Sequence, residues 1–346
     1  METILVTGGC GYIGSHTCVC LVKNGYNVVI LDSLINSFDN SFLKIKNVLL
    51  KEKISNKGRI SFIKGDVRDE AFLERLFSEQ KKNNKRITRV IHFAGLKCIY
   101  ESIKYPLKYW EVNVQGTITL LKVMKKHNCF SIIFSSSATV YKPNSTKLLN
   151  EEDILKPSSP YGKTKLAIED FLKDLYESDK KNWRIASLRY FNPVGSHFSG
   201  LIGENPKGES SNLFPAILKV LKNYQKNLLV FGNDWPTKDG TCIRDFIHVL
   251  DLAEAHIATL NFLFSNKPQY LTLNIGTGKG RSILQVINQF NNLEKGILKY
   301  NFVQKRIGDH PIIVADNKLA LKLLDWEPKR TLKDMCEDTI NNVKSK

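Results

Sequence analysis

The sequence lacks several features that would assign it to common protein classes. Its 346 residues contain no uninterrupted apolar run that approaches the ~20 residues of a membrane span. The seven cysteines show no CxxC spacing and the seven histidines no HExxH spacing, so we do not expect a metal site. Cysteines scattered in an odd number instead indicate free thiols, most of them packed in the interior.

The N-terminus lacks the basic region, apolar core and cleavage site of a signal peptide, because METILVTGG leads directly into a strand-like run. We therefore expect a cytoplasmic protein. The net charge of +17 raises nucleic acid as a partner. However, the lysines are spread along the whole chain, without a dense basic stripe or a nucleic-acid-binding motif. We expect neither a nucleic-acid nor a membrane partner.

Short apolar segments rich in β-branched residues alternate with helical patterns in the first half of the chain. Near-continuous apolar strands separated by helices are typical of a parallel sheet covered on both faces. The sequence therefore predicts an α/β fold with a doubly wound, Rossmann-type parallel sheet. The expected strands are 2–8, 27–32, 60–66, 89–95, 130–136 and 184–190, and the expected helices 12–24, 41–53, 70–80, 112–127 and one that begins at Tyr161.

The texture changes after residue 190. Gly, Pro, Asn and Ser crowd residues 191–215, and shorter helices and strands follow, up to a helix near 331–343. We predict a first domain over residues 1–190 and a smaller C-terminal α/β lobe, mainly for substrate, over 191–346, and the chain can cross between them. A ligand would sit in the cleft between the two.

The stretch VTGGCGYIG places Gly8, Gly11 and Gly14 at the end of the first strand and the start of the first helix. There the backbone must turn tightly and can approach a pyrophosphate, whose charge the helix N-terminus favours. Because strand-to-helix turns often use glycine in any case, the turn alone is weak support for a cofactor site.

Three further strand ends agree with the glycine turn. The second strand ends at Asp32, whose carboxylate can accept hydrogen bonds from ribose hydroxyls and would repel a 2′-phosphate. The third run ends in Asp66, placed to reach an adenine edge. The fourth ends in Phe93, Ala94 and Gly95, a small-residue stretch against which a dinucleotide could lie. The sequence therefore predicts NAD binding by the first domain.

A tyrosine and a lysine lie four residues apart in SPYGKTK, at the start of a helix: Tyr161 and Lys165 share one face. A nearby cation could lower the pKa of the phenol enough for it to act as a base near neutral pH. Ser137, where the fifth strand runs into SSSATVY, could hydrogen-bond a substrate hydroxyl. Each motif alone is common, but their combination in an NAD-binding sheet favours catalysis.

The glycine turn, SSSATVY and YGKTK together resemble the extended short-chain dehydrogenase/reductase superfamily. Within it, the chain is similar from first strand to last helix to the UDP-glucose 4-epimerase family, through VIHFAGLK, LRYFNPVG, GLIGENPKG, FGNDWPTKDGTCIRDFIHVLDLA and NIGTG. The resemblance implies interconversion of UDP-galactose and UDP-glucose. The C4 hydroxyl would be oxidised to a ketone with bound NAD, the sugar would turn over, and the hydride would return to the other face.

The resemblance also implies roles for individual residues. Tyr161 would be the base and then the acid, Ser137 would bind the substrate hydroxyl, and Lys165 would hold the phenolate and the nicotinamide ribose. Further cofactor contacts are implied for Tyr12, Ile13, Asn36, Ser37, Val67, Lys97, Asn113, Ser135 and Tyr190, beside those at Gly8, Gly11, Gly14, Asp32, Asp66, Phe93, Ala94 and Gly95.

A substrate site and a dimer follow from the same resemblance. Arg244 and Arg306 would bind the diphosphate, because a guanidinium fork matches phosphate oxygens. Asp309 would accept from the uridine ribose, and Asn192, Asn212, Leu213 and Phe231 would complete the site for the UDP-sugar. A homodimer would pack through helices around 112–127 and 161–179.

Several alternatives stay open. Related dehydratases and decarboxylases place an acid beside the active-site serine or threonine, where this chain has Ala138 and Thr139. Ser211 replaces a frequent asparagine, and Tyr100 a frequent glycine. Ile313 is intermediate in bulk at a position that admits or excludes an N-acetyl group. A 4-epimerase for UDP-GlcNAc and UDP-GalNAc or another UDP-sugar, or a non-catalytic NAD-bound sensor, are the remaining hypotheses.

Overall fold

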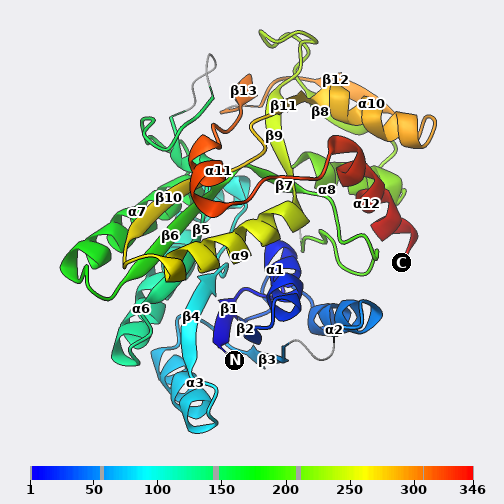
Figure 1. Ribbon diagram of the computed structural model, residues 1–346. Coiled ribbons are helices and arrows are strands. Elements are labelled where there is room, and N and C mark those ends of the chain that lie inside the picture. The colour runs from blue at the N-terminus through cyan, green and yellow to red at the C-terminus, as the bar shows by residue number, and fades with distance from the viewer. Residues whose placement is uncertain (1, 55–57, 143–147, 208–211, 307, 346) are drawn as a thin grey trace.

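The computed structural model describes residues 2–54, 58–142, 148–207, 212–306 and 308–345. Its largest element is a seven-stranded sheet in the order β10-β6-β5-β4-β1-β2-β3 (Figure 1). Every pairing in it is parallel. In chain order the strands are β1 (Thr3–Thr7), β2 (Asn27–Asp32), β3 (Ile60–Lys64), β4 (Ile87–His92), β5 (Ser131–Ser137), β6 (Arg184–Tyr190) and β10 (Tyr270–Ile275).

Helices cover both faces of this sheet. One face carries α1 (Tyr12–Lys23), α2 (Ser41–Lys51), α9 (Val249–Ser265) and α11 (Lys318–Leu324), and the other α3 (Glu70–Lys82), α6 (Gly116–Lys126) and α7 (Pro160–Ser178). Neighbouring strand residues alternate between the two buried clusters: Ile133 packs with the first set of helices and Ile132 with the second. The prediction of a doubly wound α/β fold is confirmed.

Two features of the first half differ from the expectation. The helix expected over 112–127 is a π-helical turn, η1 (Trp110–Gln115), that continues into α6, and two short helices precede it, α4 (Ile99–Lys104) and α5 (Pro106–Tyr109). The sheet also has a seventh strand, β10, which comes from beyond residue 190 and pairs with β6. The chain therefore returns to the first sheet, and the division at residue 190 stays a prediction.

Among the described residues, the remaining elements of the second half form two small sheets and three helices. A four-stranded sheet contains β7 (Asn192–Val194), β9 (Ile243–His248), β11 (Gly280–Ser282) and β13 (Ile312–Ile313), and β8 (Leu228–Phe231) pairs with β12 (Tyr300–Val303). A third buried cluster, which includes Phe214 and Phe290, joins them to α8 (Leu213–Leu221), α10 (Ile283–Leu293) and α12 (Leu332–Lys344). A short 3-10 turn, η2 (Ala138–Val140), follows β5.

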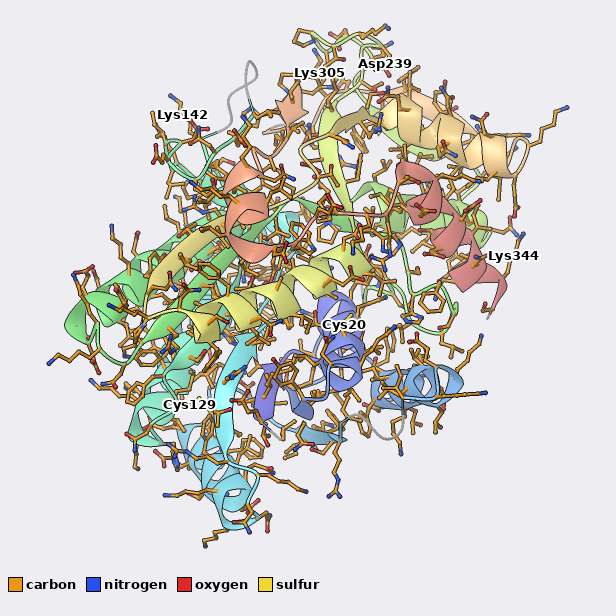
Figure 2. The ribbon with its side chains drawn as sticks, viewed as in Figure 1. Cys20, Cys129, Lys142, Asp239, Lys305 and Lys344 are labelled. Carbon is orange, nitrogen blue, oxygen red and sulfur yellow. The ribbon has the colours of Figure 1, made fainter. Side chains whose placement is uncertain are left out.

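The seven cysteines are all free, and all except Cys98 are buried, as the sequence predicts. Figure 2 shows Cys20 and Cys129 within the fold and Lys344 on its outside. Within the described ranges, no helix has the length and apolar character needed to cross a bilayer. The same residues contain no group of three or more His, Cys, Asp and Glu side chains arranged to hold a metal ion.

The interior strand β5 generates a prediction about stability. Ile133 is fully buried in β5, whereas Ile154 is 68% exposed. Replacing Ile133 by alanine removes buried methyl groups and leaves a cavity, and we expect a loss of about 2–5 kcal/mol in the free energy of unfolding. Urea titration followed by circular dichroism measures it. Ile154→Ala is the matched control, and an equal loss in both variants would contradict this account of the core.

Candidate active site

β1 passes into α1 through the glycine turn. Gly8 has a φ of +70°, and a Cβ there would lie 2.7 Å from the backbone nitrogen of Ala94. A Cβ on Gly14 would lie 2.4 Å from the carbonyl oxygen of Gly8, and one on Gly11 3.2 Å from the same atom. No side chain caps the start of α1, so its first N–H groups can face an anion. The turn therefore fits the pyrophosphate of a dinucleotide.

Asp32 is fixed beside this turn at the end of β2. Its Oδ2 accepts from the backbone N–H of Cys10 at 2.9 Å, and its Oδ1 accepts from the N–H of Leu34 and the hydroxyl of Ser37, both at 2.8 Å. Three donors thus orient a buried carboxylate, which keeps lone pairs for ribose hydroxyls. Ser37 acts through Asp32 here, and Asn36 is exposed in the same loop.

Asp66, after β3, is bound by a neighbouring arginine. Arg68 donates from Nε and a terminal nitrogen to the two carboxylate oxygens at 3.1 and 2.8 Å, and also pairs with Glu111 at 2.7 Å. The hydrogen bond from Arg68 is the main reason that the pKa of Asp66 lies below its usual value. Any contact with an adenine edge must share this carboxylate with Arg68. Val67 is buried against Gly116.

Asn113 lies in the π-helical turn, and its side-chain amide makes hydrogen bonds within the protein. Its Oδ1 accepts from the backbone N–H of Leu96 at 2.7 Å, and its Nδ2 donates to the carbonyl of Leu96 and the hydroxyl of Thr164, both at 3.1 Å. It therefore ties the turn after β4 to α7. A Cβ on Gly95 would lie 3.0 Å from Asn113 Oδ1 and 3.9 Å from Lys165 Nζ, so the small residue leaves room.

Three other residues that the sequence assigns to the cofactor contact the rest of the protein as follows. Lys97 pairs with Glu204 at 3.2 Å, and its ammonium lies 5.9 Å from the ring centre of Tyr12. Tyr12, whose hydroxyl donates to the Gly195 carbonyl at 2.7 Å, ties α1 to the second half of the chain. Ile13 packs against the core.

The end of β6 meets α9 through an aromatic contact. The hydroxyl of Tyr190 lies 2.7 Å from Nε2 of His256. The His256 ring packs on the ring of Phe93, with 5.0 Å between their centres. Tyr190 and Phe93 therefore lie near each other at the carboxyl ends of β6 and β4.

α7 begins where the sequence predicts. The Oγ of Ser159 accepts from the backbone N–H of Gly162 at 3.1 Å, and Pro160 is the first helical residue. The serine satisfies one of the unpaired N–H groups of the first turn, and proline has a φ suited to that position. This start fixes Tyr161 and Lys165 one turn apart.

The three catalytic candidates lie together. The Oγ of Ser137 accepts from the N–H and the hydroxyl of Thr139 at 3.2 and 3.0 Å. Lys165 Nζ donates to the carbonyl of Ser135 at 2.7 Å and lies 5.8 Å from the ring centre of Tyr161. The structure thus brings strand end and helix start together as predicted.

Burial is the main influence on the protonation of the tyrosine. Burial raises the pKa of Tyr161 to about 12, and a hydrogen bond with Ser137 opposes this only in part. Lowering of this pKa by Lys165 stays a prediction. The ammonium donates to the Ser135 carbonyl, and burial lowers its own pKa to about 8, against the charge of Glu169.

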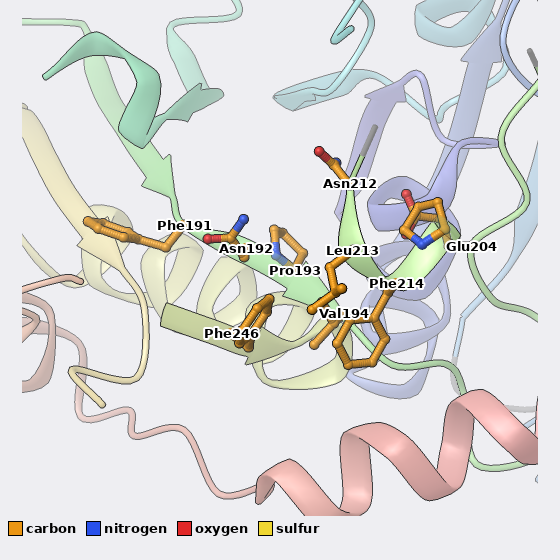
Figure 3. A pocket seen from close by; sticks show the side chains of 10 residues that line it. Phe191, Asn192, Pro193, Val194, Glu204, Asn212, Leu213, Phe214 and Phe246 are labelled. Carbon is orange, nitrogen blue, oxygen red and sulfur yellow. The ribbon is translucent and has the colours of Figure 1, made fainter. Parts of the chain in front are cut away.

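The second half of the chain meets this site through β7. Asn192 follows Tyr190 by two residues and pairs in register with Phe246, which lies two residues after Arg244 in β9. A cavity of about 60 Å³ lies here, and Figure 3 shows Asn192, Asn212, Leu213 and Glu204 around it. Asn212 is the N-cap of α8, and Leu213 is its first residue.

The predicted diphosphate and uridine residues form one cluster. The guanidinium of Arg306 stacks 3.6 Å above the ring centre of Phe231. Arg244 lies 3.6 Å from the carboxylate of Asp309 and donates to the carbonyl of His310 at 2.7 Å. Two guanidinium groups, one acid and an aromatic face therefore lie together, which suits a nucleoside diphosphate.

The residues that depart from the family pattern are placed as follows. Ile313 is half-buried and packs in a cluster with Ala138 and Tyr141, so it borders the strand end that carries Ser137. Tyr100 is 68% exposed on α4. Ser211 lies outside the described residues.

Two charged residues near the site were missed by sequence reasoning. Glu169 and Arg189 form an ion pair at 2.6 Å, and each side chain is at most 4% exposed. The sequence carries a signal for the first: Glu169 follows Lys165 by four residues, as Lys165 follows Tyr161, so all three share a helix face. Arg189 had no comparable local signal.

Comparisons with known proteins agree with this geometry. Residues 5–339 match the family model described as GDP-mannose 4,6 dehydratase. A curated relative, UDP-glucose 4-epimerase 1 of Oryza sativa subsp. japonica, is 44% identical over 99% of this chain and 94% of its own length.

Solved structures are also similar over nearly the whole chain. The UDP-glucose-4-epimerase of Stenotrophomonas maltophila, with bound NAD and formylated UDP-arabinopyranose, has a TM-score of 0.92 at 41% identity and covers 100% of this chain and 98% of its own. The enzyme of Bifidobacterium longum, in complex with NAD+ and UDP, has a TM-score of 0.91 at 40% identity over 99% and 98%. The chain belongs to the UDP-glucose 4-epimerase family of the extended short-chain dehydrogenases/reductases.

Proposed function

We propose that this chain interconverts UDP-galactose and UDP-glucose by transient oxidation at the sugar C4. The observation that carries the proposal is the meeting of Ser137, Tyr161 and Lys165 at the carboxyl end of β5, beside the glycine turn. When bound, NAD would supply the acceptor for the C4 hydride and a positive charge beside the phenol. The glycine turn and Asp32 would bind the NAD.

The roles of the side chains follow from their contacts. Ser137 would hydrogen-bond the 4-hydroxyl, and Tyr161 would take its proton and return it after the keto sugar has turned over. Because burial raises the pKa of Tyr161 to about 12, the phenol is protonated near neutral pH, and it needs added positive charge to act as a base. Lys165, held by the Ser135 carbonyl, would supply part of that charge.

The side chains beside Ser137 support epimerisation over elimination. The family model that matches bears the name of a dehydratase, and elimination requires a further acid or base beside the sugar. Ala138 and Thr139, which follow Ser137, have no ionisable group. The seven free cysteines are compatible with the cytoplasmic location proposed from the sequence.

Replacing Tyr161 by phenylalanine tests the mechanism. We expect a loss of at least about 100-fold in kcat, because one positioned proton-transfer group is removed. The rate of UDP-glucose formation from UDP-galactose measures it, with the melting temperature as a check on folding. Tyr176→Phe, on the same helix, is the matched control. Near-normal turnover by Tyr161→Phe would contradict the mechanism, and a wild type that holds NAD without turnover would favour the sensor.

A second candidate function is 4-epimerisation of UDP-GlcNAc and UDP-GalNAc. It is favoured by Ile313, an intermediate side chain where the family resemblance associates tyrosine with exclusion of the N-acetyl group. We expect Ile313→Tyr to lower kcat/KM for UDP-GlcNAc relative to UDP-galactose by about tenfold or more, since specificity of this kind depends on small changes in pocket volume. Ile312→Tyr is the control, because neighbouring strand residues point to opposite faces. An unchanged ratio would remove Ile313 as the determinant.

We further propose a homodimer through α6 and α7, the helices expected from the sequence. Apolar side chains support it on the neighbouring α4, α5 and η1: Leu107 is 84% and Ile103 62% exposed, and α4 and α5 pack against α7. We expect Leu107→Glu to shift the protein from dimer to monomer in light scattering, because a charge would enter the interface. Leu50→Glu, at a position of α2 that is 64% exposed, is the control. A wild-type monomer would contradict the proposal.

A further inference from the structure

We propose that Glu169 is a positioning residue for the catalytic lysine: its buried carboxylate, clamped by Arg189 and Ser136, keeps the Lys165 ammonium charged and in place. The inference rests on the proposed function of Lys165 and deepens it. It assigns a role to an ion pair that the reaction itself does not use.

One face of α7 is attached to β5 by the lysine and the glutamate. Tyr161, Lys165 and Glu169 are spaced by four residues and share one face of the helix. Lys165 donates to the carbonyl of Ser135, and the next strand residue, Ser136, donates from its hydroxyl to Glu169. The lysine and the glutamate therefore attach one helix face to consecutive residues of β5, directly before Ser137.

The Glu169 carboxylate is held firmly by hydrogen bonds from Arg189. Arg189, which lies opposite Ser136 in β6, donates from Nε to Oε1 at 3.0 Å and from a terminal nitrogen to Oε2 at 2.6 Å. The remaining terminal nitrogen of Arg189 donates to the hydroxyl of Tyr141 at 2.8 Å and the carbonyl of Glu151 at 3.1 Å. Because both sides of the pair are anchored, the carboxylate has a single position.

The buried ammonium of Lys165 requires a nearby negative charge to stay protonated. Lys165 is only 4% exposed, and burial lowers its pKa to about 8, while the charge of Glu169 acts in the opposite direction. From β4, His92 faces the lysine; burial and the lysine charge lower the His92 pKa to about 3, so this imidazole is neutral. From β6, Tyr190 lies close to Tyr161. Among the described residues, Glu169 is the acid that acts on Lys165.

The other elements that pack against α7 carry charges that are paired elsewhere. On α4 and α5, Glu101 pairs with Lys108 at 2.9 Å. Lys104 interacts with Tyr105, and in η1 Glu111 pairs with Arg68. The short turn η2 contains no ionisable residue. Glu169 is paired as well, with Arg189, but among the described residues it is the acid whose charge raises the pKa of Lys165.

Loss of Glu169 should move the pH dependence of activity to lower pH. A lysine is charged below its pKa, and loss of a neighbouring negative charge lowers that pKa. Without Glu169, Lys165 would give up its proton at a lower pH, and activity that needs the ammonium would fall earlier as the pH rises.

The experiment compares pH profiles of two Glu169 variants. Glu169→Gln removes the charge but leaves Arg189 buried and unpaired, which threatens folding. The double variant Glu169→Leu/Arg189→Met replaces the whole pair by apolar groups of similar size, which buried pairs tolerate. Asp251→Asn is the control, because it breaks a buried ion pair with Arg330 that involves α9, on the opposite face of the sheet.

We expect the alkaline limb of kcat to move to lower pH by about one unit in Glu169→Gln and by less in the double variant, which also removes the opposing charge of Arg189, with KM little changed. Above that limb, a shift of one unit corresponds to about tenfold lower kcat. Asp251→Asn should lower the melting temperature and leave the pH profile of kcat unchanged. A folded double variant with the wild-type pH profile would overturn the proposal.

A readout without turnover separates this inference from the proposed function. In protein labelled with ¹⁵N at the lysine side chains, NMR follows the Lys165 ammonium, assigned by its loss in Lys165→Arg. We expect it to titrate at lower pH in the Glu169 variants even if UDP-galactose proves not to be the substrate. The same titration midpoint with and without Glu169 would overturn the proposal by itself.

Discussion

A positive charge buried at the carboxyl end of β5 is the constraint on which the site depends. The Lys165 ammonium is buried, and burying a charged group costs free energy unless it finds hydrogen-bond acceptors and an opposite charge. The Ser135 carbonyl supplies the acceptor at 2.7 Å, and Glu169 supplies the charge. These two interactions hold α7 against β5, and the same helix positions Tyr161.

The parallel sheet explains how distant segments reach one crevice. All seven strands point the same way, so the glycine turn, Asp32, Gly95 and Ser137 emerge at one edge although they span more than a third of the chain. The second half of the chain joins this edge through β7, whose pairing with β9 brings the Arg244 cluster beside the end of β6. The residues proposed for the cofactor and those proposed for the nucleotide-sugar therefore lie toward the same edge of the sheet.

Much of this arrangement could be predicted from local patterns. The strands at 27–32 and 184–190 have the expected bounds, and α7 begins at Pro160, next to the expected Tyr161, because apolar runs and helix caps are encoded by neighbouring residues. What depends on distant contacts could not be predicted. β10 is a strand because β6 offers it an edge, and Asn113 is occupied because Leu96 and Thr164 fold beside it. The pKa of Tyr161 depends on its burial, which its distance from Lys165 in the sequence does not reveal.

The most direct measurement is proton NMR of UDP-galactose in D₂O with the purified protein and no added nicotinamide. The account predicts that UDP-glucose signals appear and that the new sugar keeps a proton at C4, because the hydride leaves and returns without exchange with solvent. Deuterium at C4 of the product, or the appearance of an eliminated sugar in place of UDP-glucose, would contradict it.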